Sequence, residues 1–296
     1  MPLNALDAPN DAPAQAPGYS IHHLPVSGAL GDCVNALIGV EMSAPGPVPF
    51  SVVPHDALVM TVQFGRSGFA LEEKGEPGAN TSLTGIREWT GTFAGAGNCI
   101  TLFALLSPLG AVRLLDSRPL DDAPRIRASV AEMLDHGIAR QLETGLALLD
   151  GVQGKLMGLA NWLETRATAH RQQTRAALRA GRAAARLTAE PTLDVQTLAD
   201  EQCVSRRQLE RDFARWIGTS PRHLSQVARV QAVSRRALGG ESLAGIAADI
   251  GFADQAHMSR VVRQLTGLPP RRFIQSQRTP MARAFRAATG GGTVYL

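Results

Sequence analysis

Cysteine is scarce in this chain of 296 residues, which has only Cys33, Cys99 and Cys203 and no CxxC pair. Neither a disulfide framework nor a structural zinc site is therefore expected. The same scarcity fits a reducing compartment. We expect Cys33 and Cys99 to be small buried hydrophobic residues, and oxidant sensing is the alternative.

The motifs of common enzymes are also missing. The sequence contains no glycine-rich phosphate loop, no GxSxG motif and no HExxH motif. Four residues could be considered as metal ligands: His22, His23, His55 and Asp56. Their spacing matches no metal-binding pattern, and isolated histidines are usually structural or solvated. We therefore expect no enzyme activity, no catalytic residue, no metal ion and no cofactor.

Long apolar runs are absent as well. The longest, residues 99–106, stops at Ser107 and Pro108, well short of the length that crosses a bilayer. Residues 1–18 lack a basic segment followed by an apolar run, so they are expected to be a disordered leader and not a signal peptide. These absences predict a soluble, cytoplasmic protein that does not bind membranes.

Lysine does not occur after residue 170, and this marks a division of charge. Residues 1–170 carry 10 Lys+Arg against 17 Asp+Glu, a net −7, whereas residues 171–296 carry 20 against 9, a net +11. All 20 of the later cations are arginine, which favours bidentate contacts with phosphates and guanines. The arginine bias of a high-GC genome is the alternative. The asymmetry predicts a basic module that meets a polyanion and an acidic module with another task.

The acidic part, residues 19–170, has the pattern of a β-rich domain. Leu58, Met60, Val62 and Phe64 recur at every second position, which is typical of a half-buried strand. Further short strands are predicted at residues 68–71, 82–89 and 99–106. Closely spaced short strands favour a barrel or a sandwich.

Helices are predicted after this sheet, at residues 125–136 and 140–165. Leucines recur intermittently along the second of them and give it an apolar stripe. This helical segment either closes the first domain or pairs with its copy in a dimer.

The region 194–275 repeats nearly the same sequence. Leu198 and Ile246 are 48 residues apart, as are Cys203 and Gly251, and one inserted residue then raises the offset to 49. A repeat at a fixed spacing is an architectural signal. Each copy has the pattern of a helix, a tight turn and a second helix.

Capping residues delimit the helices of this basic part. The predicted N-caps are Asp194, Ser205, Ser220, Ser242 and Asp254, and the glycines that end helices are Gly218 and Gly267. The predicted helices are 174–187, 195–201, 205–217, 221–238, 242–250, 254–266 and a short one that starts at Pro269-Pro270 and holds Phe273. The helix 221–238 is roughly 25–30 Å long at 1.5 Å per residue. It can therefore place two reading helices in successive major grooves, which lie about 34 Å apart.

Each reading helix has one apolar face. Leu209 and Phe213 point inward in the first copy, so Arg207 and Arg211, one turn apart, project together on the other side. In the second copy Met258 and its apolar neighbours point inward and leave a polar face exposed.

The residues from about 174 to 277, roughly a third of the chain, resemble the DNA-binding domain of the AraC/XylS family of bacterial transcription regulators. The most specific piece is IAADIGFADQAHMSRVVRQLTGLPPRRF, with its Ile-Ala, Gly-Phe turn, Ser-Arg pair, and Gly-x-x-Pro followed by an aromatic residue. Met258 and Val262 stand where the family more often has phenylalanine, and both remain apolar. Cys203 replaces the usual glycine of the first turn, which puts the geometry of that turn in doubt.

The resemblance assigns base-reading positions to both copies. They are Arg207, Glu210 and Arg211 in the first, and Gln255, Ala256, His257 and Arg260 in the second. An arginine can donate two hydrogen bonds to guanine, whereas Ala256 can touch only a thymine methyl.

Two of these positions have an alternative role. Glu210 either accepts from cytosine or pairs with Arg206 on its own helix. Arg260 either reads bases or supports the fold by pairing with Asp249. Other arginines are expected to contact phosphate or solvent: Arg206, Arg215, Arg222, Arg229 and Arg263.

The expected fold class is α+β with two domains. It comprises a disordered leader (1–18), a β-rich sensor-like domain closed by helices (19–170), an all-α domain with two helix-turn-helix units (171–279) and a flexible tail (280–296). The first domain is similar to the sensor-like domains, often cupin-like barrels, of part of the AraC/XylS family. That similarity implies an effector-sensing or dimerisation role.

The favoured function is sequence-specific transcription regulation. The expected partners are double-stranded DNA, RNA polymerase, an unknown small-molecule effector and a second copy of the chain. Two alternatives remain: a DNA-repair type of protein, in which a reactive cysteine domain is joined to this module, and an architectural DNA binder with little sequence preference.

Overall fold

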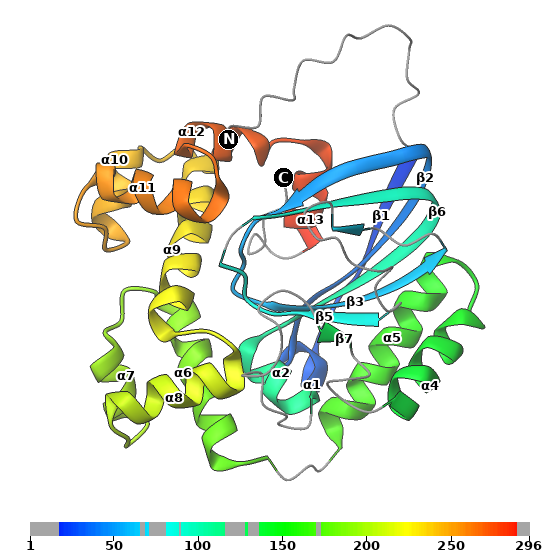
Figure 1. Cartoon of the computed structure of the whole chain (residues 1–296), viewed down its shortest axis with the longest axis horizontal. Coiled ribbons are helices and arrows are strands. Elements are labelled where there is room, and N and C mark those ends of the chain that lie inside the picture. Colours follow the sequence, from blue (N-terminus) through cyan, green and yellow to red (C-terminus); the bar gives the residue numbers. More distant parts are fainter. Residues whose placement is uncertain are drawn as a thin grey trace, which may run out of the picture.

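The computed structural model describes residues 18–65, 69–70, 81–88, 90–115, 128–129, 136–169 and 173–288. They form a strongly curved antiparallel sheet, with two helices against it on one side and the repeated helical units on another (Figure 1). This arrangement confirms the expected α+β class with a strand-rich N-terminal part and a helical C-terminal part. The predicted leader, apart from Gly18, lies outside the described residues.

The sheet contains seven described strands. They are β1 (Gly18–Leu24), β2 (Val34–Val52), β3 (Leu58–Gly65), β4 (Phe69–Ala70), β5 (Thr81–Thr84), β6 (Gly91–Leu106) and β7 (Ala128–Ser129). The order is β1-β2-β6-β3-β5-β7, β4 pairs with β6, and every pair is antiparallel. A register shift between Ala44 and Val48 marks a bulge in β2, where a long strand can bend.

The strand predicted at 58–64 is confirmed as β3, and Met60 and Val62 are fully buried. The other predicted strands differ in length, because β5 ends at Thr84 and β6 begins at Gly91. The strand predicted at 68–71 is β4, of which the structure describes Phe69–Ala70.

Helices near the sheet bury one of its faces. They are α1 (Gly28–Gly31), α2 (Pro108–Leu114), α4 (His136–Ala147) and α5 (Gly151–Thr168). Gly39 of β2 permits the close approach of α5, since a Cβ there would lie 2.4 Å from Cγ2 of Val152. The side chains of Val152 and Leu156 belong to the core beneath.

The helix predicted at 140–165 is two helices. The chain breaks after Ala147 and α5 starts at Gly151, whose φ is +62°. The buried Lys155 stabilises the break, because its Nζ donates to the carbonyl oxygens of Leu146 (2.8 Å) and Leu149 (2.6 Å). A cation at the C-terminal end of a helix is favoured by the exposed carbonyl dipoles.

The helix predicted at 125–136 is wrong at residues 128–129. Residues 128–129 form strand β7, which pairs with β5, and His136 begins α4. The remaining positions of that prediction lie outside the described residues.

The C-terminal helices match the predicted spans closely. They are α6 (Arg175–Ala189), α7 (Val195–Glu201), α8 (Arg206–Ile217), α9 (Pro221–Leu238), α10 (Leu243–Asp249), α11 (Gln255–Thr266) and α12 (Pro270–Ser276). The side chains of Asp194, Ser205, Ser220, Ser242 and Asp254 all accept from backbone N–H groups at helix starts. The local capping signals therefore act as the sequence predicts.

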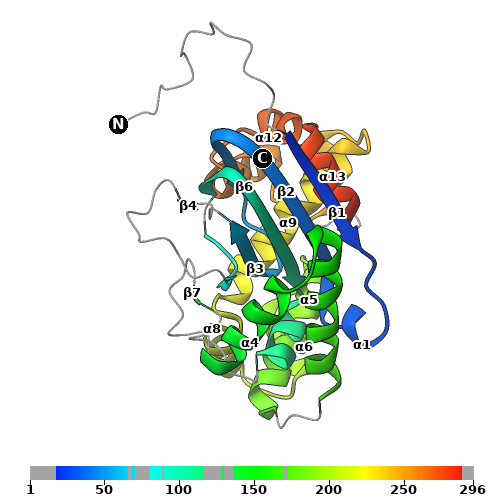
Figure 2. The ribbon, with the colours of Figure 1, turned by 90° about the vertical axis from the view of Figure 1, so that its right-hand side faces the viewer.

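Residues 280–288, assigned from sequence to a flexible tail, form helix α13 (Pro280–Ala288). The helix lies against β1 and β2 (Figure 2). Phe285 is 4% exposed and meets the ring of Phe103 edge-on, with 5.8 Å between ring centres. One aromatic side chain on an otherwise alanine- and arginine-rich helix therefore anchors it to the sheet.

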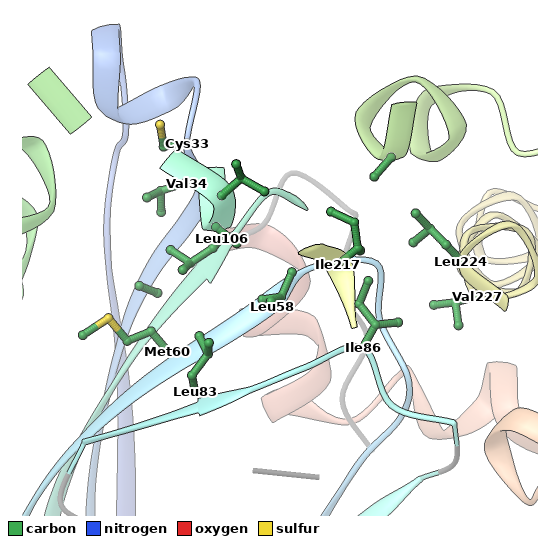
Figure 3. Packing of buried hydrophobic residues seen from close by; sticks show 14 of the residues in the cluster. Cys33, Val34, Leu58, Met60, Leu83, Ile86, Leu106, Ile217, Leu224 and Val227 are labelled. Atoms are coloured by element: carbon green, nitrogen blue, oxygen red, sulfur yellow. The ribbon is translucent and has the colours of Figure 1, made fainter. Parts of the chain in front are cut away.

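A single apolar core runs from the sheet into the helical units. Figure 3 shows Leu58 and Leu83 of the sheet, then Ile86 and Ile217, and finally Leu224 of α9 in succession. Because the same buried cluster includes both parts of the chain, the N-terminal domain and the helical units pack on one another. No helix among the described residues is long and apolar enough to span a membrane.

Candidate nucleic-acid interface

The first helix-turn-helix unit consists of α7 and α8. Leu209 and Phe213 are fully buried, and Leu198 and Ala199 of α7 lie in the same core. Arg207 and Arg211 lie on the opposite, exposed side of α8. The predicted division of this helix into a buried face and an exposed face is therefore present.

A chain of hydrogen bonds holds Arg211. Its Nη2 donates to Oε1 of Gln208 over 2.6 Å, and Nε2 of Gln208 donates to Oδ1 of Asp212 over 2.8 Å. The other oxygen of Asp212 accepts from Nε of Arg179 over 2.8 Å. The carboxylate is only 5% exposed and joins α8 to α6. Paired charges of this kind restrict the rotamers of the groups they hold.

Gln208 and Asp212 were missed by the sequence analysis as functional residues. The signal was available, since positions 208, 211 and 212 lie three and four residues apart on one helix. The partner Arg179 could not be identified from spacing, because it is 33 residues away on α6.

Arg206 and Glu210 form an ion pair along the helix surface, with 3.0 Å between Nε and Oε1. This is the alternative role that the sequence analysis gave to Glu210. Both side chains are about half exposed, so the pair contributes little stability in water. It can open without much cost when another partner approaches.

The turns of the two units share a left-handed residue at equivalent positions. Cys203 has φ +55° and Gly251 has φ +76°. Cys203 is the non-glycine residue with positive φ in the described chain. The turn therefore keeps its shape despite the replacement of glycine, and the Cβ of Cys203 bears the strain.

The second unit consists of α10 and α11. Met258, Val262 and Leu265 are buried, whereas Gln255, Ala256, Arg260 and Arg263 are exposed. The candidate base-reading residues of α11 are therefore exposed, as predicted, with one exception.

The exception is His257, which is half-buried and turned towards its own turn. Its Nδ1 accepts from the backbone N–H of Ala253 over 3.3 Å, and its ring meets Phe252 edge-on at 5.5 Å. In this conformation the imidazole stabilises the turn. Only its Nε2 side remains for a contact with another molecule.

Helix α9 joins the two units, which lie at its opposite ends (Figure 1). Its 18 residues span about 27 Å at 1.5 Å per residue. Arg229, expected to contact phosphate or solvent, instead ties α9 to the second turn. It donates to the carbonyl of Gly251 over 3.0 Å and to Oγ of Ser225, and its guanidinium lies over Phe252. Burial lowers the pKa of this guanidinium.

Asp249 accepts from Arg236, not from Arg260. Nη2 of Arg236 contacts Asp249 and Glu241 over 2.5 Å each. The hydrogen bond to Glu241, and to a lesser extent the one to Asp249, raises the pKa of Arg236. Arg260 therefore remains exposed on α11. The pairing with Asp249 that the sequence analysis considered for Arg260 is made by Arg236.

The candidate metal ligands of the N-terminal domain do not gather. His22 and His23 lie in β1, whereas His55 is buried at the turn before β3. Among the described residues no group of three or more His, Cys, Asp or Glu side chains could hold a metal ion. Burial lowers the pKa of His55 to about 4, so it is neutral near pH 7.

The two N-terminal cysteines are both buried. Burial raises the pKa of Cys33, with nearby Arg113 opposing, and burial also raises the pKa of Cys99. A thiol acts as a nucleophile in its ionised form, so neither environment favours reactivity. The geometry does not support an activated cysteine at these positions.

A surface depression of about 730 Å³ lies at one end of the sheet. Four strands line it, β1, β2, β3 and β6. Glu41 is the charged residue of the lining, beside the apolar side chains of Phe64 and Ile100. Ser43 and Asn98 are hydrogen-bonded to each other on the same surface.

Residues 198–276 match the sequence model of a family described as a helix-turn-helix domain. No curated protein sequence matches the chain. Among solved structures, ToxT from Vibrio cholerae is 9% identical with a TM-score of 0.43, covering 88% of this chain and 98% of that one. CdpR from Pseudomonas aeruginosa is 19% identical (TM-score 0.29; 61% and 46% covered). The AraC-like activator CuxR is 14% identical (TM-score 0.27; 66% and 79% covered).

Proposed function

We propose that this chain, which carries a helix-turn-helix domain of the AraC type, is a sequence-specific transcription regulator that inserts α8 and α11 into successive major grooves of one DNA duplex. The observation that carries the proposal is the pair of capped helices with exposed polar faces at the two ends of α9. The length of α9, about 27 Å, suits two grooves that repeat every 34 Å or so when the width of the flanking helices is added.

Arg207 and Arg211 read guanines in the first groove under this proposal. Each can donate two hydrogen bonds to O6 and N7, with about 1–3 kcal/mol of discrimination for each good pair. Gln208 holds Arg211 before DNA arrives, and this reduces the entropy lost on binding. Glu210 keeps its pairing with Arg206 until a cytosine amino group or a phosphate displaces one partner.

In the second groove Gln255 and Arg260 supply the hydrogen bonds, and Ala256 contacts a thymine methyl. His257 contributes through the shape of its turn, since its Nδ1 is engaged there. Arg263, together with Arg215 and Arg222, contacts phosphates and sets the register of the protein on the duplex. All three are exposed.

The N-terminal domain receives the signal in this proposal. Its depression beside Glu41 offers both an apolar wall and polar groups, which are typical of a small-molecule site. Leu148, between α4 and α5, and Met157 of α5 are exposed and offer an apolar face for a second copy of the chain. RNA polymerase is the expected partner at a promoter.

The experiment begins with wild-type protein and a pool of random DNA duplexes, from which bound sequences are recovered. Arg211→Ala is then compared with wild type on the selected site and on its single-base variants. We expect a loss of about 1–3 kcal/mol, with relaxed preference at one base pair.

Arg222→Ala is the matched control. A phosphate contact predicts equal weakening on every sequence and a salt dependence that is flatter by about one unit of slope. Equal loss for Arg211→Ala on selected and random DNA would reject its base-reading role. Failure to enrich any sequence would reject the regulator in favour of an architectural binder.

A further inference from the structure

The loop between β5 and β6 contacts both helix-turn-helix units. The carbonyl of Arg87 accepts from Nε2 of His223, in the first turn of α9, over 2.8 Å. Three residues later, Oγ1 of Thr90 donates to the carbonyl of Leu265, in the last turn of α11, over 3.2 Å. One short segment of the N-terminal domain therefore reaches the start of α9, just after the first unit, and the end of the second unit.

Apolar packing reinforces the first of these contacts. Ile86 is 5% exposed and lies beside Ile217, the last residue of α8, and near Leu224 and Val227 of α9 (Figure 3). The side chain thus fills the corner where α8 turns into α9. A tilt of α8 against α9 would open this corner and expose apolar surface.

A further anchor lies along α9. Nε2 of Gln231 donates to the carbonyl of Pro54 over 2.7 Å, and Gln231 is 1% exposed. Gln231 follows His223 by eight residues, or about 12 Å along the helix axis. Two points on α9 and one on α11 are consequently fixed to loops that connect strands of the same sheet.

We propose that the β5–β6 loop, together with Pro54, is a brace through which the N-terminal domain sets the relative placement of α8 and α11. His223, Gln231 and Thr90 are then positioning residues, which determine the half-site spacing that the protein accepts without touching DNA. The inference rests on the proposed function, because spacing has meaning only for a protein that reads two grooves.

Geometry supports this role over that of simple domain packing. Helix α9 attaches to each unit directly. The backbone of one connecting helix does not by itself prevent a unit from rotating about the axis of α9, so side-chain contacts must restrain that rotation. The bond from Thr90 to Leu265 lies off α9, on the reading helix itself. A restraint at that point opposes rotation of the second unit relative to the first.

The test uses full-length protein and the duplex selected from the random pool, with the distance between its two halves changed by one or two base pairs. The variant is Thr90→Val/His223→Leu, which removes the side-chain hydrogen bonds from the loop to α9 and to α11. Thr168→Val/His22→Leu makes the same chemical changes away from the loop. A duplex with one half-site alone measures reading without spacing.

Wild type and the control are expected to prefer the selected spacing over neighbouring ones by about tenfold or more. The brace variant should reduce this preference to about threefold, while affinity for the single half-site changes less than about twofold. An unchanged spacing profile in the folded variant overturns the brace. So does an equal loss on the single half-site, because a merely structural defect acts on both duplexes alike.

Gln231→Leu provides an independent variant should the double variant not fold. It places an apolar side chain of similar size at this position and removes the bond to Pro54, and it is expected to broaden the spacing profile in the same way. If wild type enriches no sequence from the pool, the proposed function fails, and the brace with it. If wild type enriches a paired site and both variants keep its spacing, only the brace fails.

Discussion

The turns of the two units predict opposite changes in the free energy of unfolding for two substitutions at equivalent positions. Cys203 and Gly251 both adopt left-handed backbone angles. A Cβ in this conformation costs about 1–2 kcal/mol, which Cys203→Gly would recover. Glycine, however, loses more conformational entropy on folding, and this offsets roughly 0.5–1 kcal/mol of the gain. We therefore expect Cys203→Gly to raise the free energy of unfolding by about 0.5–1 kcal/mol, or the Tm by about 2 °C.

Gly251→Ala should have the opposite effect. A Cβ at this position would lie 2.9 Å from Cγ2 of Thr192, in addition to the strained backbone. The expected loss is about 1–3 kcal/mol. Thermal and urea unfolding of the full chain measure both changes.

Cys203→Ala is the control, because it removes the thiol but keeps the Cβ. Its stability should stay close to that of wild type. If Cys203→Gly is no more stable than Cys203→Ala, strain at the first turn is not the cause and the reasoning is refuted.

Two further predictions concern contacts of the N-terminal sheet. The folded-state pKa of His55 is about 4, below its ordinary value of 6.5. As the pH falls from 6.5 towards 4, the unfolded chain binds a proton at this residue before the folded chain does. The free energy of unfolding therefore falls by up to about 3 kcal/mol over this range, and the full stability is present above pH 6.5. Burial raises the pKa of Asp56 and works in the opposite direction, so unfolding should be compared across pH between wild type and His55→Gln. An identical pH dependence of the two would contradict the role of His55. Phe285→Ala should cost about 3 kcal/mol of packing on Phe103 and expose α13 to protease after Thr279, and resistance equal to wild type would show that the ring does not anchor the helix.

Local signals account for the success of prediction in the helical units. Asp194 and Ser205 cap α7 and α8 with their own side chains, and Gly218 ends α8 with φ +73°. Each of these interactions joins residues no more than five positions apart. A short window of sequence therefore contains the information that fixes the helix boundaries.

The sheet was predicted less well because its strands depend on distant partners. Strand β2 includes the stretch SAPGPVP, which has the local composition of a loop, yet its first two and last two residues pair with β6 some 45 to 55 positions later. Residues 128–129 likewise form a strand through pairing with β5. Such ladders are tertiary contacts, and local propensity does not reveal them.

The candidate site shows the same division. The exposed positions of α8 and α11 follow from helical periodicity, and this is why Arg207, Arg211 and Arg260 were correctly expected on the exposed faces. The contacts that restrain neighbouring side chains were not predicted. Asp212 meets Arg179 of α6, and Arg229 turns to Gly251. An arginine in a sequence carries no sign of whether it points to solvent or to a carbonyl.

The two units share a pattern but differ in how they are held. A largely buried pair, Arg179 with Asp212, joins the first unit to α6, whereas the more exposed ion pairs of Arg236 join the second to α9. Salt screens exposed pairs and leaves buried ones largely intact. Added salt therefore weakens the ion pairs between α9 and the second unit more than it weakens the Arg179–Asp212 pair. Both units also contribute to the same buried apolar cluster, so the difference lies in the polar contacts that hold them.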